Sequence, residues 1–281
     1  MIAVRPSKVD ACGFAFMTPL EITEPIRLLV ADIDGCLSGG SSTHYSMTLL
    51  SRLREVNAAS KHDLCVPAVT FCTGRPQPYV ECLMQATGGY MPALCEGGAV
   101  FFDPATHAVL THPAFGAREQ QRLDEIHSIV RRELTGPNVM FEPGKVTHIT
   151  LIVTPPLRPA DIIAPAREIA ARFDGEFLVE STRVCVHILF RHIHKGTGIE
   201  WLADHTGIRP SQMAGMGDAA PDIPFLSLMA VACAPANAAP EVRALCAHAS
   251  DRPDAEAAIE FIDMIITANR RLAARRSSSA P

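Results

Sequence analysis

The chain has 281 residues, and 48% of them are hydrophobic, so it can bury one large core or two smaller ones. Its formal net charge of −5 argues against nucleic-acid and membrane-surface binding. The nine cysteines form no Cys-x-x-Cys pair, which argues against a disulfide framework and a zinc knuckle. This cysteine pattern favours a reducing compartment, so we expect a cytoplasmic protein. No run reaches the roughly 18 apolar residues of a membrane span.

In chain order, the first predicted element is a buried strand. Residues 1–24 precede it with little periodicity, so we expect an N-terminal arm there. The strand is the apolar run IRLLVADIDG (26–35), and CVPAVTFCTGR (65–75) predicts a second strand. Between them, MTLLSRLREVNAAS (47–60) places leucine and valine at helical spacing. This alternation of apolar strands and amphipathic helices predicts an α/β fold with a Rossmann-like parallel-sheet core.

The middle of the chain has a different pattern. Its strands alternate partly between polar and apolar residues and are accompanied by two helices, which predicts an inserted α+β module. We therefore expect a core of residues 1–80 and 190–281, and an inserted cap of residues 81–189. The sheet pattern returns after the cap, and the basic, serine-rich residues 275–281 are expected to form a flexible tail.

Four short polar segments follow predicted strands or open predicted helices. Parallel sheets bind ligands at the carboxyl ends of their strands, so we expect the segments to meet in one crevice. Two carboxylates as close in sequence as Asp32 and Asp34 repel each other unless a cation or a shared proton offsets their charge. The segments are Asp32-Ile33-Asp34-Gly35, Thr73-Gly74-Arg75, Lys195-Gly196, and Gly217-Asp218 with Asp222.

In this order the segments resemble the four motifs of the haloacid dehalogenase superfamily of phosphohydrolases. The resemblance covers most of residues 26–250, and although each motif alone is common, all four in order form a specific pattern. The inserted module has the position and length of the large α/β cap found in the branch of Cof-type and sugar-phosphate phosphatases. The resemblance implies a magnesium-dependent hydrolase that acts on a small phosphorylated metabolite, such as a sugar phosphate.

The resemblance also implies roles for the polar side chains. Asp32 is the implied nucleophile, which forms an aspartyl-phosphate, and Asp34 is the implied acid and base at the leaving group. Thr73 and Lys195 are the implied hydrogen-bond donors to the phosphoryl group. Further implied substrate-binding positions are Gly74, Arg75 and Gly196. The implied Mg²⁺ ligands are Asp32, Asp34 through its backbone carbonyl, Asp218 and Asp222, a set of oxygen donors that suits this ion.

Other interpretations remain open from the sequence alone. A phosphosugar mutase of the same fold and a non-catalytic metabolite-binding protein would carry the same segments. Residues 215–220 also fit the dinucleotide pattern Gly-x-Gly-x-x-Ala, although the strand before them is short. The oligomeric state is left open.

The chain departs from the family pattern at a few positions. Pro221 stands where many capped relatives have asparagine, and Asn237 is a candidate to replace the lost contact. Glu96 stands where relatives often have asparagine at the entry to the cap. Cap residues that we expect as candidates to face the site are Glu142, Lys145, His148, His187 and Arg191.

Overall fold

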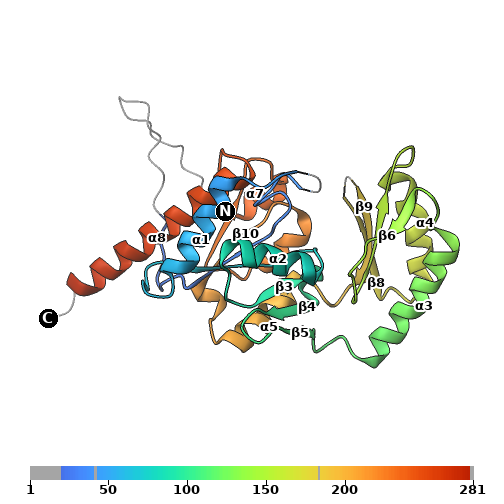
Figure 1. Cartoon of the computed structure of the whole chain (residues 1–281), viewed down its shortest axis with the longest axis horizontal. Helices are drawn as coiled ribbons and strands as arrows, with labels where there is room; N and C mark the ends of the chain where they lie inside the picture. The colour runs from blue at the N-terminus through green and yellow to red at the C-terminus, as the bar shows by residue number, and fades with distance from the viewer. Residues whose placement is uncertain (1–19, 41–42, 183, 279–281) are drawn as a thin grey trace.

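The computed structural model describes residues 20–40, 43–182 and 184–278, which form a larger and a smaller unit (Figure 1). A five-stranded parallel sheet in the order β12-β11-β10-β1-β2 lies at the centre of the larger unit. Its strands are β1 (Leu28–Ala31), β2 (Ala68–Phe71), β10 (Met213–Met216), β11 (Val231–Ala234) and β12 (His248–Ala249). The predicted α/β fold with a parallel-sheet core is confirmed.

Helices cover both faces of the parallel sheet. Alternate residues of β1 point to opposite faces: Leu29 packs among residues of α1, α2 and α8, whereas Leu28 packs among residues of α5, α6 and α7. Each central strand is buried along its whole length for this reason, which explains its continuous apolar sequence. The helices are α1 (Met47–Ala59), α2 (Gln77–Thr87), α5 (Lys195–Thr206), α6 (Ile223–Leu226), α7 (Pro240–Leu245) and α8 (Asp254–Ser278).

A small antiparallel sheet, in the order β3-β4-β5, lies beside the parallel sheet. Its strands are β3 (Ala93–Cys95), β4 (Val100–Asp103) and β5 (Ala108–Thr111), and the 3₁₀ turn η1 (Glu96–Gly98) joins the first two. Phe101 and Phe102 of β4 pack into the hydrophobic clusters on either face of the parallel sheet. Two further 3₁₀ turns, η2 (Pro210–Gln212) and η3 (Ala220–Asp222), flank β10.

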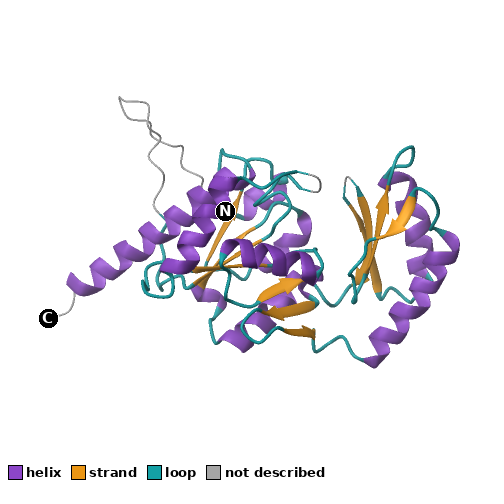
Figure 2. Ribbon diagram, in the orientation of Figure 1, coloured by secondary structure: helices purple, strands orange, loops and turns teal. Residues whose placement is uncertain are grey.

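The smaller unit is a four-stranded antiparallel sheet with two helices on one face (Figure 2). Its strands, in the order β6-β7-β9-β8, are β6 (Val139–Phe141), β7 (Ile149–Val153), β9 (Cys185–Phe190) and β8 (Phe177–Ser181). The helices α3 (Ala117–Glu133) and α4 (Pro159–Ala171) bury apolar residues against every second strand residue. The opposite face of this sheet is turned toward the larger unit (Figure 1). We call the smaller unit the cap and the larger unit the core.

The packing bears on the domain boundaries expected from the sequence. The expected boundary at residue 81 would divide α2, yet Val80, Leu83 and Met84 of that helix lie in one hydrophobic cluster of the core. Since β3 and β4 also pack into the core, we propose that the cap begins after β5. Sequence patterns cannot show this boundary, because an amphipathic strand does not reveal which of two neighbouring cores it joins.

The ends of the chain differ in part from expectation. The expected arm falls mainly on residues 1–19, which lie outside the described residues, and residues 20–24 carry no helix or strand. At the other end, α8 continues to Ser278 and thus includes part of the expected flexible tail, while residues 279–281 lie outside the described part. Over the described residues, no helix has both the length and the apolar character needed for a membrane span.

Candidate active site

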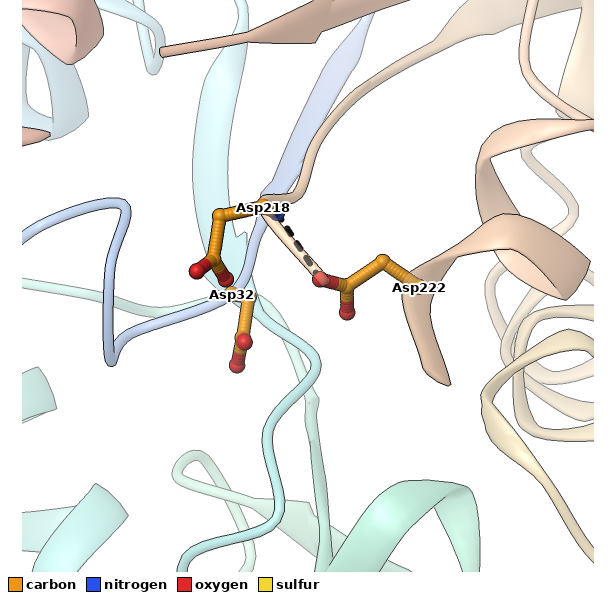
Figure 3. Close-up of side chains that lie close together, drawn as sticks. All are labelled: Asp32, Asp218 and Asp222. Atoms are coloured by element: carbon orange, nitrogen blue, oxygen red, sulfur yellow. Dashed lines mark hydrogen bonds between the residues drawn. The ribbon is translucent and has the colours of Figure 1, made fainter. Parts of the chain in front are cut away.

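Side chains that follow two neighbouring parallel strands and one that begins a helix meet at a single point of the core. Asp32 directly follows β1, and Asp218 follows β10, the strand paired with β1. Lys195 is the first residue of α5, and its Nζ atom lies 3.0 Å from Asp32 Oδ1 and 2.5 Å from Asp222 Oδ1. Carboxylate oxygens of Asp32, Asp218 and Asp222 lie within 4.8 Å of one another (Figure 3). The structure therefore brings together residues of three sequence segments that are far apart in the chain.

Burial and like charge shift the pKa values of this group. Burial raises the pKa of Asp32 to about 7, against the opposing charge of Lys195. Burial, together with the charges of Asp32 and Asp222, raises the pKa of Asp218 to about 7. Burial alone would lower the pKa of Lys195, but the carboxylates of Asp222 and Asp32 outweigh it and raise this pKa. A single ammonium group thus stands among three carboxylates, and this excess of oxygen donors suits a divalent cation.

Asp222 uses both of its carboxylate oxygens within the protein. Oδ1 pairs with Lys195, and Oδ2 accepts hydrogen bonds from the backbone N–H groups of Asp218 at 2.9 Å and Ala219 at 3.0 Å. By contrast, the carboxylate of Asp218 has no hydrogen bond or ion pair to any described side chain. These contacts fit Asp32 and Asp218 as the side chains that would hold a metal ion, and Asp222 as the residue that fixes Lys195.

Glycine at position 35 makes room for the carboxylate of Asp218. A Cβ atom added there would lie 2.2 Å from Asp218 Oδ2, and the backbone of Gly35 has a φ of +85°, which other residues rarely adopt. The carbonyl of Gly35 accepts a hydrogen bond of 2.8 Å from Asn237, and Asn237 in turn accepts one from the N–H of Asp254. Asn237 therefore holds the loop after β1, a role different from the compensation for Pro221 that the sequence suggested.

The side chain of Asp34 is turned away from the three carboxylates. It forms a two-pronged ion pair with Arg75, in which Nε and Nη2 each lie 2.7 Å from a carboxylate oxygen. The same guanidinium lies 4.8 Å from the ring centre of Tyr79 and 3.8 Å from the carboxylate of Glu142 in the cap. Arg75, expected to bind substrate, thus contacts the expected acid and base, and it links Asp34 to the cap.

The other sequence-predicted residues lie at the edges of this site. Thr73 follows β2 by two residues, is buried, and accepts a hydrogen bond of 3.2 Å from the N–H of Arg75 through Oγ1. The carbonyl of Gly74 accepts a hydrogen bond from the ammonium of Lys145 in the cap. A Cβ atom at Gly196 would lie 3.0 Å from the carbonyl oxygen of Pro224, so glycine lets the start of α5 pack closely.

Glu96 is a buried anchor between the core and the cap. Its carboxylate accepts hydrogen bonds from the N–H groups of Val146 at 3.0 Å and Thr147 at 2.9 Å, and from the Thr147 hydroxyl at 2.6 Å. His148 Nδ1 lies 3.5 Å from the same carboxylate. Burial raises the pKa of Glu96, and the hydrogen bonds from Thr147 oppose that shift. The residue that departs from the family pattern at the cap entry therefore holds the β6–β7 connection against the core.

The expected cap candidates have different positions. Glu142 and Lys145 contact the core, as described above, while Arg191 bonds the carbonyls of Gly175 and Phe177 within the cap. His187 lies on the face of the cap sheet turned toward the core, as do two residues that the sequence did not single out, Thr150 and Glu180. In FLVES (177–181), Glu180 falls on the face opposite Phe177 and Val179, a sequence signal that could have placed it on the polar face of its strand, whereas the apolar run around Thr150 gives no such signal.

Comparisons with known proteins identify relatives of this chain. The sequence profile of the haloacid dehalogenase-like hydrolases matches residues 109–262. A phosphoglycolate phosphatase of Methanopyrus kandleri is 23% identical over 241 residues, which cover 85% of this chain and 97% of that protein. A second phosphoglycolate phosphatase, from Methanothrix thermoacetophila, is 34% identical over 82 residues, which cover 29% of this chain and 37% of that protein.

Solved structures share the fold. A crystal structure of a Thermoplasma acidophilum protein superimposes with a TM-score of 0.70 at 17% identity, over 86% of this chain and 99% of that one. The sucrose-phosphatase of Synechocystis, solved with sucrose and phosphate, gives a TM-score of 0.63 at 20% identity, over 86% of this chain and 98% of that one. The similarity extends across both core and cap in each case.

Proposed function

Since the profile match spans more than half of its residues, the chain belongs to the haloacid dehalogenase-like hydrolases, and on this premise we propose that it is a Mg²⁺-dependent hydrolase of phosphate monoesters of small metabolites. One observation carries the proposal: the buried Lys195 ammonium lies between Asp32 and Asp222, with Asp218 beside them. This arrangement offers a nucleophile, a cation and oxygen ligands to one phosphoryl group.

The side chains support a reaction in two steps. An oxygen of Asp32 attacks phosphorus, the bond from phosphorus to the ester oxygen breaks, and the leaving alkoxide takes a proton from Asp34. Water then attacks phosphorus, gives its proton to Asp34, and releases inorganic phosphate and free Asp32. Lys195 and Thr73 stabilise the charge on the phosphoryl oxygens. Mg²⁺, held by Asp32, Asp218 and the carbonyl of Asp34, would supply further positive charge at this group.

The ion pair between Asp34 and Arg75 has a consequence for the first step. Asp34 must release at least one of its two hydrogen bonds to Arg75 in order to reach the leaving-group oxygen. Because Arg75 also lies near Glu142, movement of the cap is coupled to the freedom of Asp34. The cap would then limit access of water until a substrate is bound.

The test is release of inorganic phosphate from a panel of esters with Mg²⁺ present and after its removal by a chelator. The panel includes phosphoglycolate and sucrose phosphate, because relatives are named for these substrates. We expect Asp32→Asn to abolish release, with the exposed Asp204→Asn as its matched control. Full activity of Asp32→Asn would contradict the assigned nucleophile. An isomerised sugar phosphate without free phosphate would identify a mutase, and binding without turnover would identify a non-catalytic protein.

A further inference from the structure

A row of polar side chains crosses the face of the cap sheet that is turned toward the core. Thr150 of β7 is directly opposite His187 of β9, and His187 is directly opposite Glu180 of β8. The N–H of Glu142, next to the end of β6, bonds the carbonyl of Thr150 and extends the row to the fourth strand. Strands lie about 4.8 Å apart, so the row spans about 14 Å.

The side chains of this row point away from the hydrophobic core of the cap. Their neighbours along the strands, among them Leu151, Val186 and Val179, are buried against α3 and α4. Because successive strand residues point to opposite faces, Thr150, His187 and Glu180 lie on the face that looks toward the core. Figure 1 shows that this face of the cap sheet is turned toward the core.

The charges of the core site act on this row. Burial raises the pKa of Glu180, and the next contributions come from the charges of Lys195 and Asp222. Burial lowers the pKa of His187 to about 4, the charges of Lys145 and Arg75 add to the shift and that of Asp34 opposes it, so the imidazole is neutral at pH 7. Contacts join one end of the row to the site, because Glu142 lies 3.8 Å from Arg75, which pairs with Asp34.

The polar groups of the row differ in whether they are already bonded. Glu142 is engaged at one end, 3.4 Å from Lys145 and 3.8 Å from Arg75. The Thr150 hydroxyl and His187 Nδ1 are 3.0 Å apart, which leaves the second ring nitrogen of His187 without a partner among the described residues. Within the same described part of the chain, the half-buried carboxylate of Glu180 has no hydrogen bond or ion pair.

These groups suit one kind of leaving group better than another. A hydroxyl can donate a hydrogen bond to the carboxylate of Glu180 and can bond the neutral ring of His187. A carboxylate on the leaving group would meet the negative charge of Glu180, while the nearby cations Arg75 and Lys145 already bond Asp34, Gly74 and Glu142.

We propose that His187 and Glu180 bind the leaving group, with the buried Thr150 holding the ring of His187, and that they select phosphate esters of uncharged, polyhydroxylated alcohols over esters that carry a carboxylate. The proposal rests on the phosphatase function proposed above and adds its substrate class. The substrate preference of this chain would then differ from phosphoglycolate, the substrate for which several of its relatives are named.

The test compares kcat/KM for hexose and hexitol 6-phosphates, phosphoglycolate and p-nitrophenyl phosphate. We expect the wild-type enzyme to prefer its best polyol ester over phosphoglycolate by at least about tenfold, the effect of one hydrogen bond to a charged group. Glu180→Gln should reduce this ratio about tenfold, mainly through KM for the polyol ester. Glu180→Lys should reverse the preference toward phosphoglycolate.

Glu168→Gln is the matched control, because Glu168 is an exposed residue of α4 on the opposite side of the cap, and its ratio should equal that of the wild type. Thermal unfolding of each variant shows whether it folds. Equal or better use of phosphoglycolate by the wild type, or an unchanged ratio in both Glu180 variants, would overturn the inference. If no ester is hydrolysed, p-nitrophenyl phosphate included, it is the phosphatase function itself that fails.

Discussion

The site in the core and the inner face of the cap differ in how completely their polar groups are bonded. In the core, Lys195 and Asp222 are buried and joined in a dense set of contacts that leaves little freedom. On the cap, Glu180 and one nitrogen of His187 have no partner among the described residues. The core is therefore organised to bind one chemical group, the phosphoryl, whereas the cap has these hydrogen-bonding groups for the rest of the substrate.

The largest effect is expected from removing the ammonium that organises the core. Lys195→Met leaves Asp32 and Asp222 buried with an uncompensated charge, which costs about 3 kcal/mol of stability. It also removes a donor to the phosphoryl group, so kcat should fall by about 10²-fold or more. Chemical denaturation and phosphate release measure the two effects.

Lys61→Met is the control, because Lys61 is an exposed lysine that lies over the ring of Tyr90, far from the site in the fold. It should keep wild-type turnover. A Lys195→Met protein with normal stability and turnover would show that Asp32 and Asp222 do not depend on the ammonium of Lys195.

The second prediction concerns the space that Gly35 leaves for Asp218. Gly35→Ala places a methyl group against the Asp218 carboxylate and should displace it, with at least a tenfold loss in apparent Mg²⁺ affinity, equivalent to about 1.4 kcal/mol. The measurement is the Mg²⁺ dependence of phosphate release. Gly40→Ala is the control, since Gly40 also has a positive φ, of +101°, but among the described residues an added Cβ would approach only Asp34 Oδ1, at an ordinary contact distance of 4.0 Å. Equal losses in both variants would assign the effect to backbone strain alone.

The difference between the two regions also explains what the sequence could predict. The family, the α/β fold class and the enzyme class, a phosphatase, are confirmed, because they depend on short contiguous segments at strand ends. The pairing of Asp34 with Arg75 was not predicted, because two adjacent strand ends do not reveal which side chains turn toward each other. Thr150 and Glu180 were missed for a related reason: their shared row exists only once the strand order β6-β7-β9-β8 is known.

The third prediction tests the anchor between the two regions. Glu96→Gln keeps the shape of the side chain but replaces one acceptor oxygen with a donor, so it loses part of the bonding to Val146 and Thr147. We expect the free energy of local opening of the β6–β7 connection to fall by about 1–3 kcal/mol, which is measured as faster amide hydrogen exchange there. Glu119→Gln is the control within the cap, because Glu119 bonds only within the start of α3 and to Arg118. Unchanged exchange in Glu96→Gln would mean that the cap is held by other contacts.

The last prediction concerns the pH dependence of cap stability. The pKa of His187 falls from 6.5 to about 4 on folding, chiefly through burial, with Lys145 and Arg75 adding to the shift and Asp34 opposing it. Between pH 6.5 and 4, His187 is protonated in the unfolded chain but not in the folded cap. The contribution of neutral His187 to the free energy of unfolding is therefore complete above pH 6.5 and is lost as the pH falls toward 4. Because His187 is partly exposed, we expect a loss of about 2 kcal/mol rather than the full value of the shift.

His187→Gln should remove this part of the pH dependence, so the free energy of unfolding should fall less steeply between pH 6.5 and 4 than in the wild type. His148, whose pKa burial also lowers, remains in the variant and retains its own contribution to the slope. His62→Gln, at an exposed position of the core, should keep the wild-type slope. If His187→Gln has that slope as well, then His187 is accessible to protons in the folded cap, and the inner face is more open to water than the core site.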